Sequence, residues 1–409
     1  MHYYNHQGRL AASPLPDLPL PRAEAGVPAL FLTAEGPARG RTVWRPTAPH
    51  HLTAPASAAW LDRTAGAGIA LPGPVRAALD AGTLTAVNVR HPRWEAALDR
   101  LAPKPGKKRV HLLAVGDVGG TLLTALKLLG GDCISAVGIC DLNEKAVERW
   151  TAEMGQIAWP WNYEALPEVE PVTADRLFDC DVFLFAATKA IPPVGSAVAD
   201  VRMAQFAANR PLVESFARQA RAARFRGLFI VLSDPVDPLC KVAYLASNTG
   251  PDGRWDGGGL FAEQVQGFGL GVMNARAAYF ARQNPRFADF LTEGRSFGPH
   301  GHGLVIANSV EHYDDEVSRA LTEQVETANL RIRDLGFKPY VAPAVSSGAM
   351  QLLLTLRGQW RCASLCLGDV WFGARSRLTA QGTETECLPL PPALRARLEE
   401  TEALLKTII

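Results

Sequence analysis

The chain has 409 residues, enough for two or three domains at roughly 100–200 residues each. Hydrophobic residues make up 47% and charged residues 20%, a globular composition that excludes a wholly disordered chain. The formal net charge is +1. A nucleic-acid binder needs a basic surplus to neutralise phosphates, so we expect no nucleic-acid partner.

The chain contains no sign of a membrane segment or a metal site. No window reaches the roughly 18 uncharged apolar residues that span a bilayer, and the first residues lack the pattern of a secretory signal. The seven cysteines are odd in number and scattered, as is usual for reduced thiols. Cys362 and Cys366 have three residues between them, not the two of common zinc pairs. We expect a cytoplasmic protein with no membrane partner and no metal.

Residues 1–107 differ in composition from the rest of the chain. They hold 14 of the 30 prolines and five of the nine histidines. They read as turns and short pieces, with helices expected at about 74–80 and 94–101. A linker rich in Pro and Lys is expected at 103–108. We interpret 1–107 as an added module that wraps a scaffold or its oligomer interface.

Beyond residue 107, short apolar runs alternate with helical patterns. The apolar runs lie at 110–115, 134–140, 181–186 and 228–233, and the longest helical patterns at 144–156 and 203–225. Continuous apolar strands between helices indicate a parallel sheet covered on both faces. The sequence therefore predicts an α/β fold, with a doubly wound domain at 108–247. A mixed α+β catalytic domain is expected at 248–409.

A glycine-rich turn follows the first apolar run and opens a helix. Such a turn places backbone N–H groups and a helix N-terminus against a pyrophosphate, and its last glycine lets the helix pack on the strand. An alanine stands where the first glycine is usual. Asp141 ends the next run, where a carboxylate binds ribose hydroxyls and repels a 2′-phosphate. A helix-capping Asp141 in a nucleotide-free sheet is the alternative. The predicted NAD-binding residues of this Rossmann-type domain are Gly116, Asp117, Val118, Gly119 and Asp141.

Five further motifs stand in one order along the rest of the chain. They are Asp200-Val201-Arg202-Met203 followed by Asn209, Ser233-Asp234-Pro235-Val236-Asp237, the segment from Gly267 to Arg276, Gly298-Pro299-His300-Gly301, and the closing helix pattern from Leu394 to Ile408. In this order they resemble the motifs of the lactate/malate dehydrogenase family. The resemblance covers about 300 of the 409 residues, from about Arg109 onward.

The resemblance implies an NAD-dependent oxidoreductase that transfers hydride between nicotinamide and a small carboxylate-bearing 2-oxo or 2-hydroxy acid. His300 is then the general acid/base, because the pKa of histidine lies near working pH. Arg276 holds the substrate carboxylate in a bidentate clamp, and Asn274 lies beside it as a substrate-binding residue. Arg202 polarises the substrate carbonyl from a closing loop. The resemblance also implies a homodimer or homotetramer.

Two departures from the family change the expected site. Met273 stands where the family has the aspartate that orients the histidine, and Asp234 stands where it has an asparagine beside the substrate oxygen. A thioether is at most a weak hydrogen-bond acceptor, so we place Asp234 among the catalytic residues as the new partner of His300. The loop before Arg202 is longer than the family's and lacks a second arginine, which makes malate a doubtful substrate.

Three functions remain open at this point. The first is oxidoreduction of a 2-oxo or 2-hydroxy acid with Asp234 serving His300. The second is reduction of an imine or oxidation of an amino acid, because an anionic Asp234 favours a cationic substrate group. The third is an inactive NAD- or metabolite-binding protein with a structural or regulatory role, in which Met273 is simple packing.

A basic run, Arg218, Arg221, Arg224 and Arg226, closes the helical pattern at 203–225. A solvated helix face with favourable placement at the negative end of the helix dipole explains it, and an anion site is the alternative.

Overall fold

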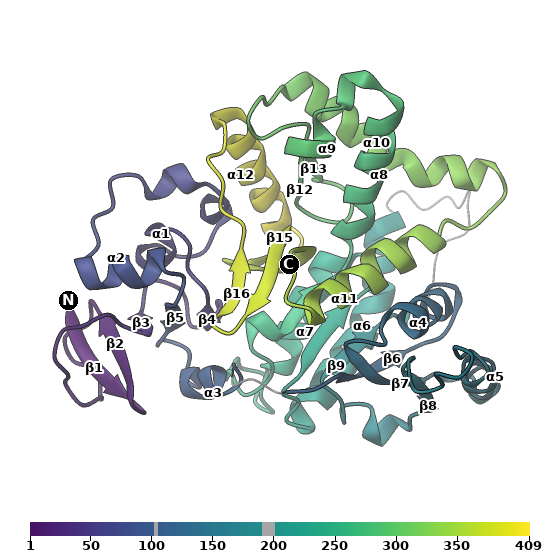
Figure 1. The fold of residues 1–409 in the computed structure, drawn as a ribbon, viewed down its shortest axis with the longest axis horizontal. Coiled ribbons are helices and arrows are strands. Elements are labelled where there is room, and N and C mark those ends of the chain that lie inside the picture. The colour runs from purple at the N-terminus through teal and green to yellow at the C-terminus, as the bar shows by residue number, and fades with distance from the viewer. Residues whose placement is uncertain (102–104, 190–200) are drawn as a thin grey trace.

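The structure, a computed structural model, describes residues 1–101, 105–189 and 201–409 (Figure 1). Part of the expected linker at 103–108 therefore lies outside the described residues. The described strands form a 14-stranded sheet and a separate two-stranded one. The large sheet has a parallel part, an antiparallel part and an N-terminal part, joined edge to edge.

The parallel part confirms the predicted doubly wound fold. Its strands are β6 (Lys108–Leu113), β7 (Ile134–Cys140), β8 (Glu168–Pro171), β9 (Val182–Phe185), β10 (Leu228–Val231) and β11 (Val265–Gly267). They lie in the order β8-β7-β6-β9-β10-β11, and all five pairings are parallel. This order, with its reversal beside β6, is that of dinucleotide-binding sheets. Because β11 belongs to it, the parallel sheet extends past the expected domain boundary at 247, and the boundaries stay predictions.

Helices cover both faces of the parallel strands. They are α4 (Asp117–Leu129), α5 (Glu144–Gly155), α6 (Val201–Ala222) and α7 (Val236–Ser247). Side chains alternate across a strand, so Phe183 and Phe185 of β9 pack in the hydrophobic core with α6 and α7. Leu184 faces the other way and packs in the core beneath α4. Burial on both faces explains why these strands are continuous apolar runs.

The C-terminal part adds antiparallel strands and a helical layer. The strands are β14 (Arg361–Leu367), β15 (Val370–Thr379) and β16 (Gly382–Thr385), and the small sheet is β12 (Arg295–Phe297) with β13 (Val305–Ala307). The helices are α8 (Leu270–Gln283), α9 (Phe290–Glu293), α10 (Asp315–Asp334), α11 (Met350–Leu356) and α12 (Pro392–Lys406). β14 pairs with β11 and so continues the parallel sheet. α12 confirms the expected closing helix.

Residues 1–107 form more regular structure than the sequence predicts. Their strands are β1 (His2–His6), β2 (Arg9–Ser13), β3 (Leu30–Thr33), β4 (Val43–Trp44) and β5 (Thr85–Asn88), and their helices are α1 (His50–Thr53), α2 (Gly73–Asp80) and α3 (Trp94–Asp99). Trp44 of β4 pairs with Thr383 of β16, so these strands extend the sheet rather than wrap around it (Figure 1). The expected helices at 74–80 and 94–101 are present. The sequence predicted turns and short pieces for this part. That description is correct only for the connections between these strands and helices.

Charged side chains fix this N-terminal part to the C-terminal one. Arg45 pairs with Glu384 at 2.9 Å, and the Arg41 Nε donates to the Cys366 carbonyl at 2.9 Å. The main-chain N–H of Ala58 donates to the Glu402 carboxylate at 2.7 Å. In the described residues, no helix is both long and apolar enough to cross a membrane.

Candidate active site and cofactor cleft

A cleft of about 1730 Å³ lies at the carboxyl ends of β6, β7 and β9. In doubly wound sheets, ligands bind at this edge, where the strand order reverses. All five residues predicted to bind NAD line the cleft, namely Gly116, Asp117, Val118, Gly119 and Asp141. Thr188 and Lys189, which follow β9, line it from the other side. The described residues thus bring the predicted nucleotide-binding positions to one cavity.

The turn between β6 and α4 has the geometry that its glycines predict. Gly116 is the N-cap of α4, so the unpaired N–H groups of the first helical turn point to the cleft. A Cβ on Gly119 would overlap the carbonyl oxygen of Ala114. Ala114, at the place of the usual first glycine, has a φ of 73°. This left-handed conformation is costly for an L-residue with a Cβ.

Asp141 is held rigidly at the end of β7. Its Oδ2 accepts the N–H of Val115 at 2.9 Å, and its Oδ1 accepts the N–H of Asn143 at 2.9 Å. Each carboxylate oxygen has a second acceptor position, which leaves Asp141 able to accept hydroxyl groups in the cleft. Neither oxygen serves the N-cap of α5, because Asn143 caps that helix. Asp141 therefore does not cap α5, and the alternative that it is a helix-capping residue is wrong.

Two further residues steady the cleft, of which the sequence analysis named Asn209 only as part of a motif and did not name Trp150. The Trp150 indole on α5 donates to the Val115 carbonyl at 3.0 Å and lies where a Cβ on Gly120 would stand. Buried Asn209 on α6 accepts the Lys189 N–H at 2.9 Å and donates to the Asp234 carbonyl at 2.8 Å. Asn209 thus joins the chain after β9 to the chain after β10.

His300 lies in the loop between β12 and β13, and each of its ring nitrogens faces an oxygen atom. Its Nδ1 lies 3.0 Å from the Gly269 carbonyl oxygen, which can only accept, so Nδ1 carries the proton. Its Nε2 lies 3.6 Å from the Asp234 Oδ1. The His300 ring is 16% exposed and Asp234 is 50% exposed. The main-chain carbonyl of Gly269 therefore holds the ring, and Nε2 faces a carboxylate that is half exposed to solvent.

Glycine is required at 269 because His300 is packed directly on it. A Cβ there would overlap the His300 Cβ and ring. Behind the ring, buried Asp237 accepts the main-chain N–H of His300 at 2.9 Å. Burial raises the pKa of Asp237, while the N–H and the charge of His300 act against that rise.

Arg276 lies one turn beyond Met273 on α8. Its guanidinium contacts the Met273 Sδ at 3.6 Å and donates to the Val325 carbonyl at 3.3 Å. Burial lowers the pKa of Arg276, and the negative charge of Asp234 opposes this change. Met273 is 3% exposed and belongs to the core between α8 and α10. Asp234 thus acts electrostatically on both His300 and Arg276, whereas Met273 serves as packing under Arg276.

The two remaining predicted residues are Asn274 and Arg202. The Asn274 carbonyl accepts the Ser296 hydroxyl of β12 at 3.2 Å. Within the described parts of the chain, Asn274 forms no hydrogen bond with His300 or Arg276. Arg202 belongs to the first turn of α6, but its side chain lies outside what the structure describes, as do residues 190–200 before it. The roles of both stay predictions.

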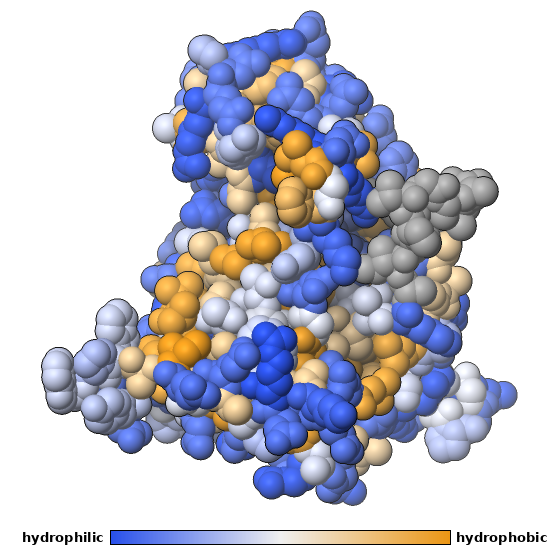
Figure 2. Space-filling view, turned by 90° about the vertical axis from the view of Figure 1, so that its right-hand side faces the viewer, coloured by the Kyte–Doolittle hydropathy of each residue, from blue (hydrophilic) through white to orange (hydrophobic). Residues whose placement is uncertain are grey.

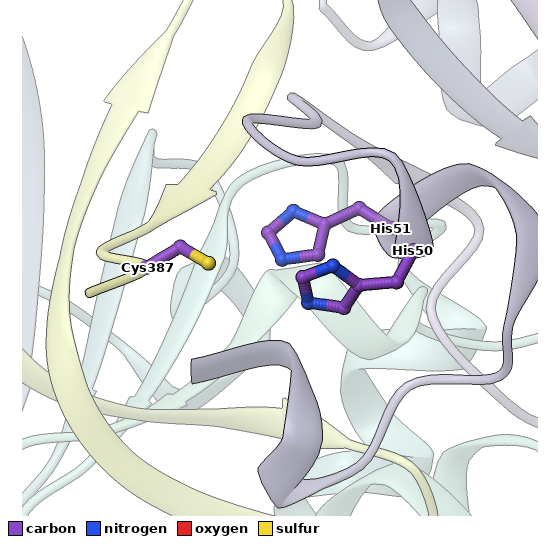
Figure 3. A group of neighbouring side chains, drawn as sticks. All are labelled: His50, His51 and Cys387. Atoms are coloured by element: carbon purple, nitrogen blue, oxygen red, sulfur yellow. The ribbon is translucent and has the colours of Figure 1, made fainter. Parts of the chain in front are cut away.

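A second group of chemistry-bearing side chains lies in the N-terminal part. Figure 3 shows the His50 and His51 rings beside Cys387, with candidate ligand atoms within 4.8 Å of one another. His51 uses both nitrogens, because Nδ1 accepts the Thr47 N–H at 3.2 Å and Nε2 lies 2.8 Å from the Trp60 carbonyl. Burial raises the pKa of the Cys387 thiol to about 12. His51 is thus hydrogen-bonded at both nitrogens and the thiol is protonated, whereas both ring nitrogens of buried His50 have no hydrogen-bond partner in the structure. The expectation of no metal stays a prediction.

No model of a known protein family matches the chain. Among curated proteins, the chain is similar to an L-lactate dehydrogenase of Corynebacterium jeikeium, with 23% identity over 244 residues. These cover 58% of this chain and 68% of the relative. The sequence likeness agrees with the resemblance to the lactate/malate dehydrogenase family.

Solved structures show the same fold. A minor L-lactate dehydrogenase of Enterococcus mundtii aligns with a TM-score of 0.59 and 19% identity, over 74% of this chain and 97% of its own. Malate dehydrogenase of Archaeoglobus fulgidus, in complex with NADH, aligns with a TM-score of 0.56 and 15% identity, over 73% and 97%. Malate dehydrogenase of Salinibacter ruber aligns with a TM-score of 0.57 and 19% identity, over 73% of this chain and 95% of its own. The chain thus has the lactate/malate dehydrogenase fold, with about a quarter of its length outside the likeness.

Proposed function

We propose that this protein is an NAD-dependent oxidoreductase that transfers hydride between nicotinamide and a small carboxylate-bearing 2-oxo or 2-hydroxy acid. The observation that carries the proposal is the group formed by His300, Asp234 and Arg276. It pairs a proton donor and acceptor with a cation suited to a carboxylate. The relatives in sequence and fold are lactate and malate dehydrogenases.

The residues of the cleft fit a dinucleotide. The N-terminal turn of α4, with Asp117, Val118 and Gly119, offers N–H groups and a positive dipole end to a pyrophosphate. Asp141, with both oxygens oriented by main-chain N–H groups, suits ribose hydroxyls and disfavours a 2′-phosphate. Bound there, NAD would accept or deliver the hydride. We therefore propose NAD rather than NADP as the cofactor.

His300 moves the proton that accompanies the hydride. In the direction of reduction, the carbonyl carbon gains the hydride and its oxygen takes a proton from the His300 Nε2. Because Nδ1 stays bonded to the Gly269 carbonyl, one ring tautomer is selected and Nε2 remains the exchanging atom. Asp234 stabilises the imidazolium that precedes transfer. In this role Asp234 supplies the charge that the family's aspartate, here Met273, would supply.

Arg276 binds the substrate carboxylate. Its burial strengthens a bidentate ion pair with a carboxylate, because water screens the two charges less. We propose Arg202 as the residue that polarises the substrate carbonyl and Asn274 as a further substrate contact, both on the family resemblance.

A second candidate is oxidoreduction at a carbon–nitrogen bond, as in imine reduction or amino acid oxidation. Asp234 favours it, because a half-exposed carboxylate 3.6 Å from the His300 Nε2 attracts a cationic iminium or ammonium group. In both functions Arg276 binds a carboxylate group of the substrate.

One experiment separates these functions. NADH binding is followed by fluorescence, and turnover is then measured on a panel of 2-oxo acids with and without ammonium or amines. Turnover with 2-oxo acids alone supports the first function, and turnover only with amines supports the second. NADH binding with no turnover on any panel member would contradict both and leave an inactive NAD-binding protein.

We propose a homodimer or homotetramer as the assembly. Large hydrophobic side chains are exposed near the end of α10, and they are Leu330, Ile332, Leu335, Phe337 and Val341. Figure 2 shows hydrophobic patches among hydrophilic residues on one face of the molecule. Exposed apolar patches often mark protein contacts. Light scattering coupled to size-exclusion chromatography measures the assembly directly, and a monomer at micromolar concentration would contradict the proposal.

A further inference from the structure

A second cavity, of about 480 Å³, lies where the N-terminal part meets the parallel sheet. It is bounded by α3, by the end of α6 with the chain leading into β10, and by residues 258–261. In Figure 1, α3 lies beside the loops of the middle part of the chain. Five arginines line it, namely Arg93, Arg100, Arg221, Arg224 and Arg226. We call it the arginine pocket.

We propose that the arginine pocket binds a small polyanion, a metabolite with two or more phosphate or carboxylate groups. The inference does not depend on the proposed catalytic function. It rests on the charge, the hydrogen-bonding capacity and the concave shape of the pocket.

The pocket has more cations than anions. Among the described residues, two carboxylates act on its arginines. Asp256 pairs with Arg221 at 2.6 Å, and the buried Glu263 attracts Arg100. Arg224 and Arg226 are exposed, and neither has a carboxylate within ion-pair distance in the part of the chain that the structure describes. Five guanidinium groups therefore share two carboxylates, and a polyanion would balance the excess.

The arginines also repel one another. Burial lowers the pKa of Arg93, and the nearby charge of Arg221 lowers it further. Burial lowers the pKa of Arg100 as well, and Arg226 acts in the same direction. Like charges held together destabilise one another, and an anion between them removes that cost.

Hydrogen-bond donors in the pocket are oriented or unused. The Arg93 guanidinium is fixed by the carbonyls of Gly257 and Gly259, at 3.2 and 3.1 Å, and lies over the Phe261 ring. The buried Nε of Arg100 has no hydrogen-bond partner in the structure. Planar guanidinium groups bind phosphate and carboxylate through paired N–H groups. Another nitrogen of the Arg100 guanidinium donates to the Arg226 carbonyl at 3.2 Å. The fixed Arg93 guanidinium and the exposed Arg224 and Arg226 are the groups that can offer N–H donors to an anion.

The shape favours a small ligand over a macromolecule. The pocket is a concave site of limited volume rather than a stripe along the surface, and the net charge of the chain is +1. It shares no lining residue with the cofactor cleft. Phe225 and Arg226 precede β10, so the pocket lies at the amino end of that strand, whereas the cleft lies at the carboxyl edge. A ligand here would join α3 to α6 and leave the cofactor cleft free.

The test is calorimetric titration of the full chain with inorganic pyrophosphate and, separately, with citrate at constant ionic strength. We expect saturable binding of at least one of them. The double variant Arg224→Gln/Arg226→Gln should weaken it by at least about tenfold, because two charge-assisted contacts are lost. Both side chains are exposed, so the variant should fold, and near-UV circular dichroism checks this. Arg218→Gln is the matched control, because Arg218 lies on α6 shortly before these two arginines, pairs with Glu214 and does not line the pocket.

Two results would overturn the proposal. One is no saturable binding of either anion. The other is binding that the double variant leaves unchanged, or that NADH displaces, because the anion would then occupy another site or the cofactor cleft. Comparing pyrophosphate with citrate shows whether phosphate or carboxylate groups are preferred.

Discussion

Histidines occur in two very different settings in this molecule. His50 and His51 lie buried in the N-terminal part beside Cys387 (Figure 3). Burial lowers the pKa of His51 to about 3, and the charge of His50 acts in the same direction. His300 instead is partly exposed, faces the Asp234 carboxylate and is oriented by a main-chain carbonyl.

The contrast teaches what makes a histidine suitable for proton transfer. His51, buried with both nitrogens hydrogen-bonded, stays neutral and has no open atom, whereas both nitrogens of buried His50 have no hydrogen-bond partner in the structure. A histidine with one nitrogen anchored and the other facing a carboxylate and solvent can take and release a proton. The number of histidines in a segment therefore carries no functional information without their hydrogen bonds.

The largest expected effect is the loss of turnover in His300→Asn. Removing the proton donor should lower kcat about 10³-fold, in the range of general acid–base catalysis, while NADH affinity stays unchanged. His302→Asn, two residues away and exposed, is the matched control and should keep its turnover. Steady-state kinetics with the best substrate of the panel measure both. Equal loss in the two variants would mean that the loop, and not the ring of His300, matters.

Met273→Asp tests whether the family's aspartate could be restored. Met273 is buried in the core between α8 and α10, so the change removes packing and buries a carboxylate. We expect the free energy of unfolding to fall by about 3 kcal/mol, with Arg276 offsetting part of the cost. Met273→Leu, close in volume, should lose less than about 1.5 kcal/mol. Urea unfolding measures both. An unchanged stability in Met273→Asp, with higher turnover, would show that the site still accepts the aspartate.

The sequence predicted the scaffold well and the N-terminal part poorly. The strands β6, β7, β9 and β10 are apolar runs between helices, which are local signals. β4 has two residues, and it pairs with Thr383, which is 339 residues beyond Trp44 in the chain. No local pattern encodes so distant a pairing. The strands of residues 1–107 were therefore read as short pieces.

The candidate site also has parts that the sequence could predict and a part that it could not. The side chains of His300, Asp234 and Arg276 could be placed by their order in the chain, because each occupies a recognisable motif. The Gly269 carbonyl that holds His300 could not, since every residue has a carbonyl and only the fold selects one. The signal that was available is the run of glycines at 267, 269 and 271, where the chain must approach other groups closely.

Acid should reveal the buried histidines by their effect on stability. His51 and His91 have folded-state pKa values lowered by burial to about 3 and about 4, against 6.5 when unfolded. Their contribution is present above pH 6.5 and is lost as the pH falls from 6.5 toward these values. Between about pH 7.5 and about pH 5.5, each should cost about 1 kcal/mol of unfolding free energy.

The variant that isolates this contribution is His51→Gln. The difference in unfolding free energy between the two pH values should shrink by about 1 kcal/mol. Burial raises the pKa values of Asp237 and Glu263, so these groups also make the unfolding free energy depend on pH. They are present in both the variant and the parent protein, and their effect cancels when the two are compared. His312→Gln is the control. Glu293 raises the pKa of exposed His312, so the shift of its pKa has the opposite direction to that of His51. An acid loss that His51→Gln leaves intact would place the effect elsewhere.

The smallest expected effect concerns Ala114 in the turn that faces the cofactor cleft. Its φ of 73° is a conformation that glycine adopts without cost, so Ala114→Gly should raise the unfolding free energy by up to about 1 kcal/mol. Ala125→Gly in the middle of α4 is the opposite control and should lower it by about 1 kcal/mol. NADH affinity should stay within about twofold, because the N–H groups of α4 are untouched. A loss of stability in Ala114→Gly would mean that the alanine methyl contributes more by packing than its backbone conformation costs.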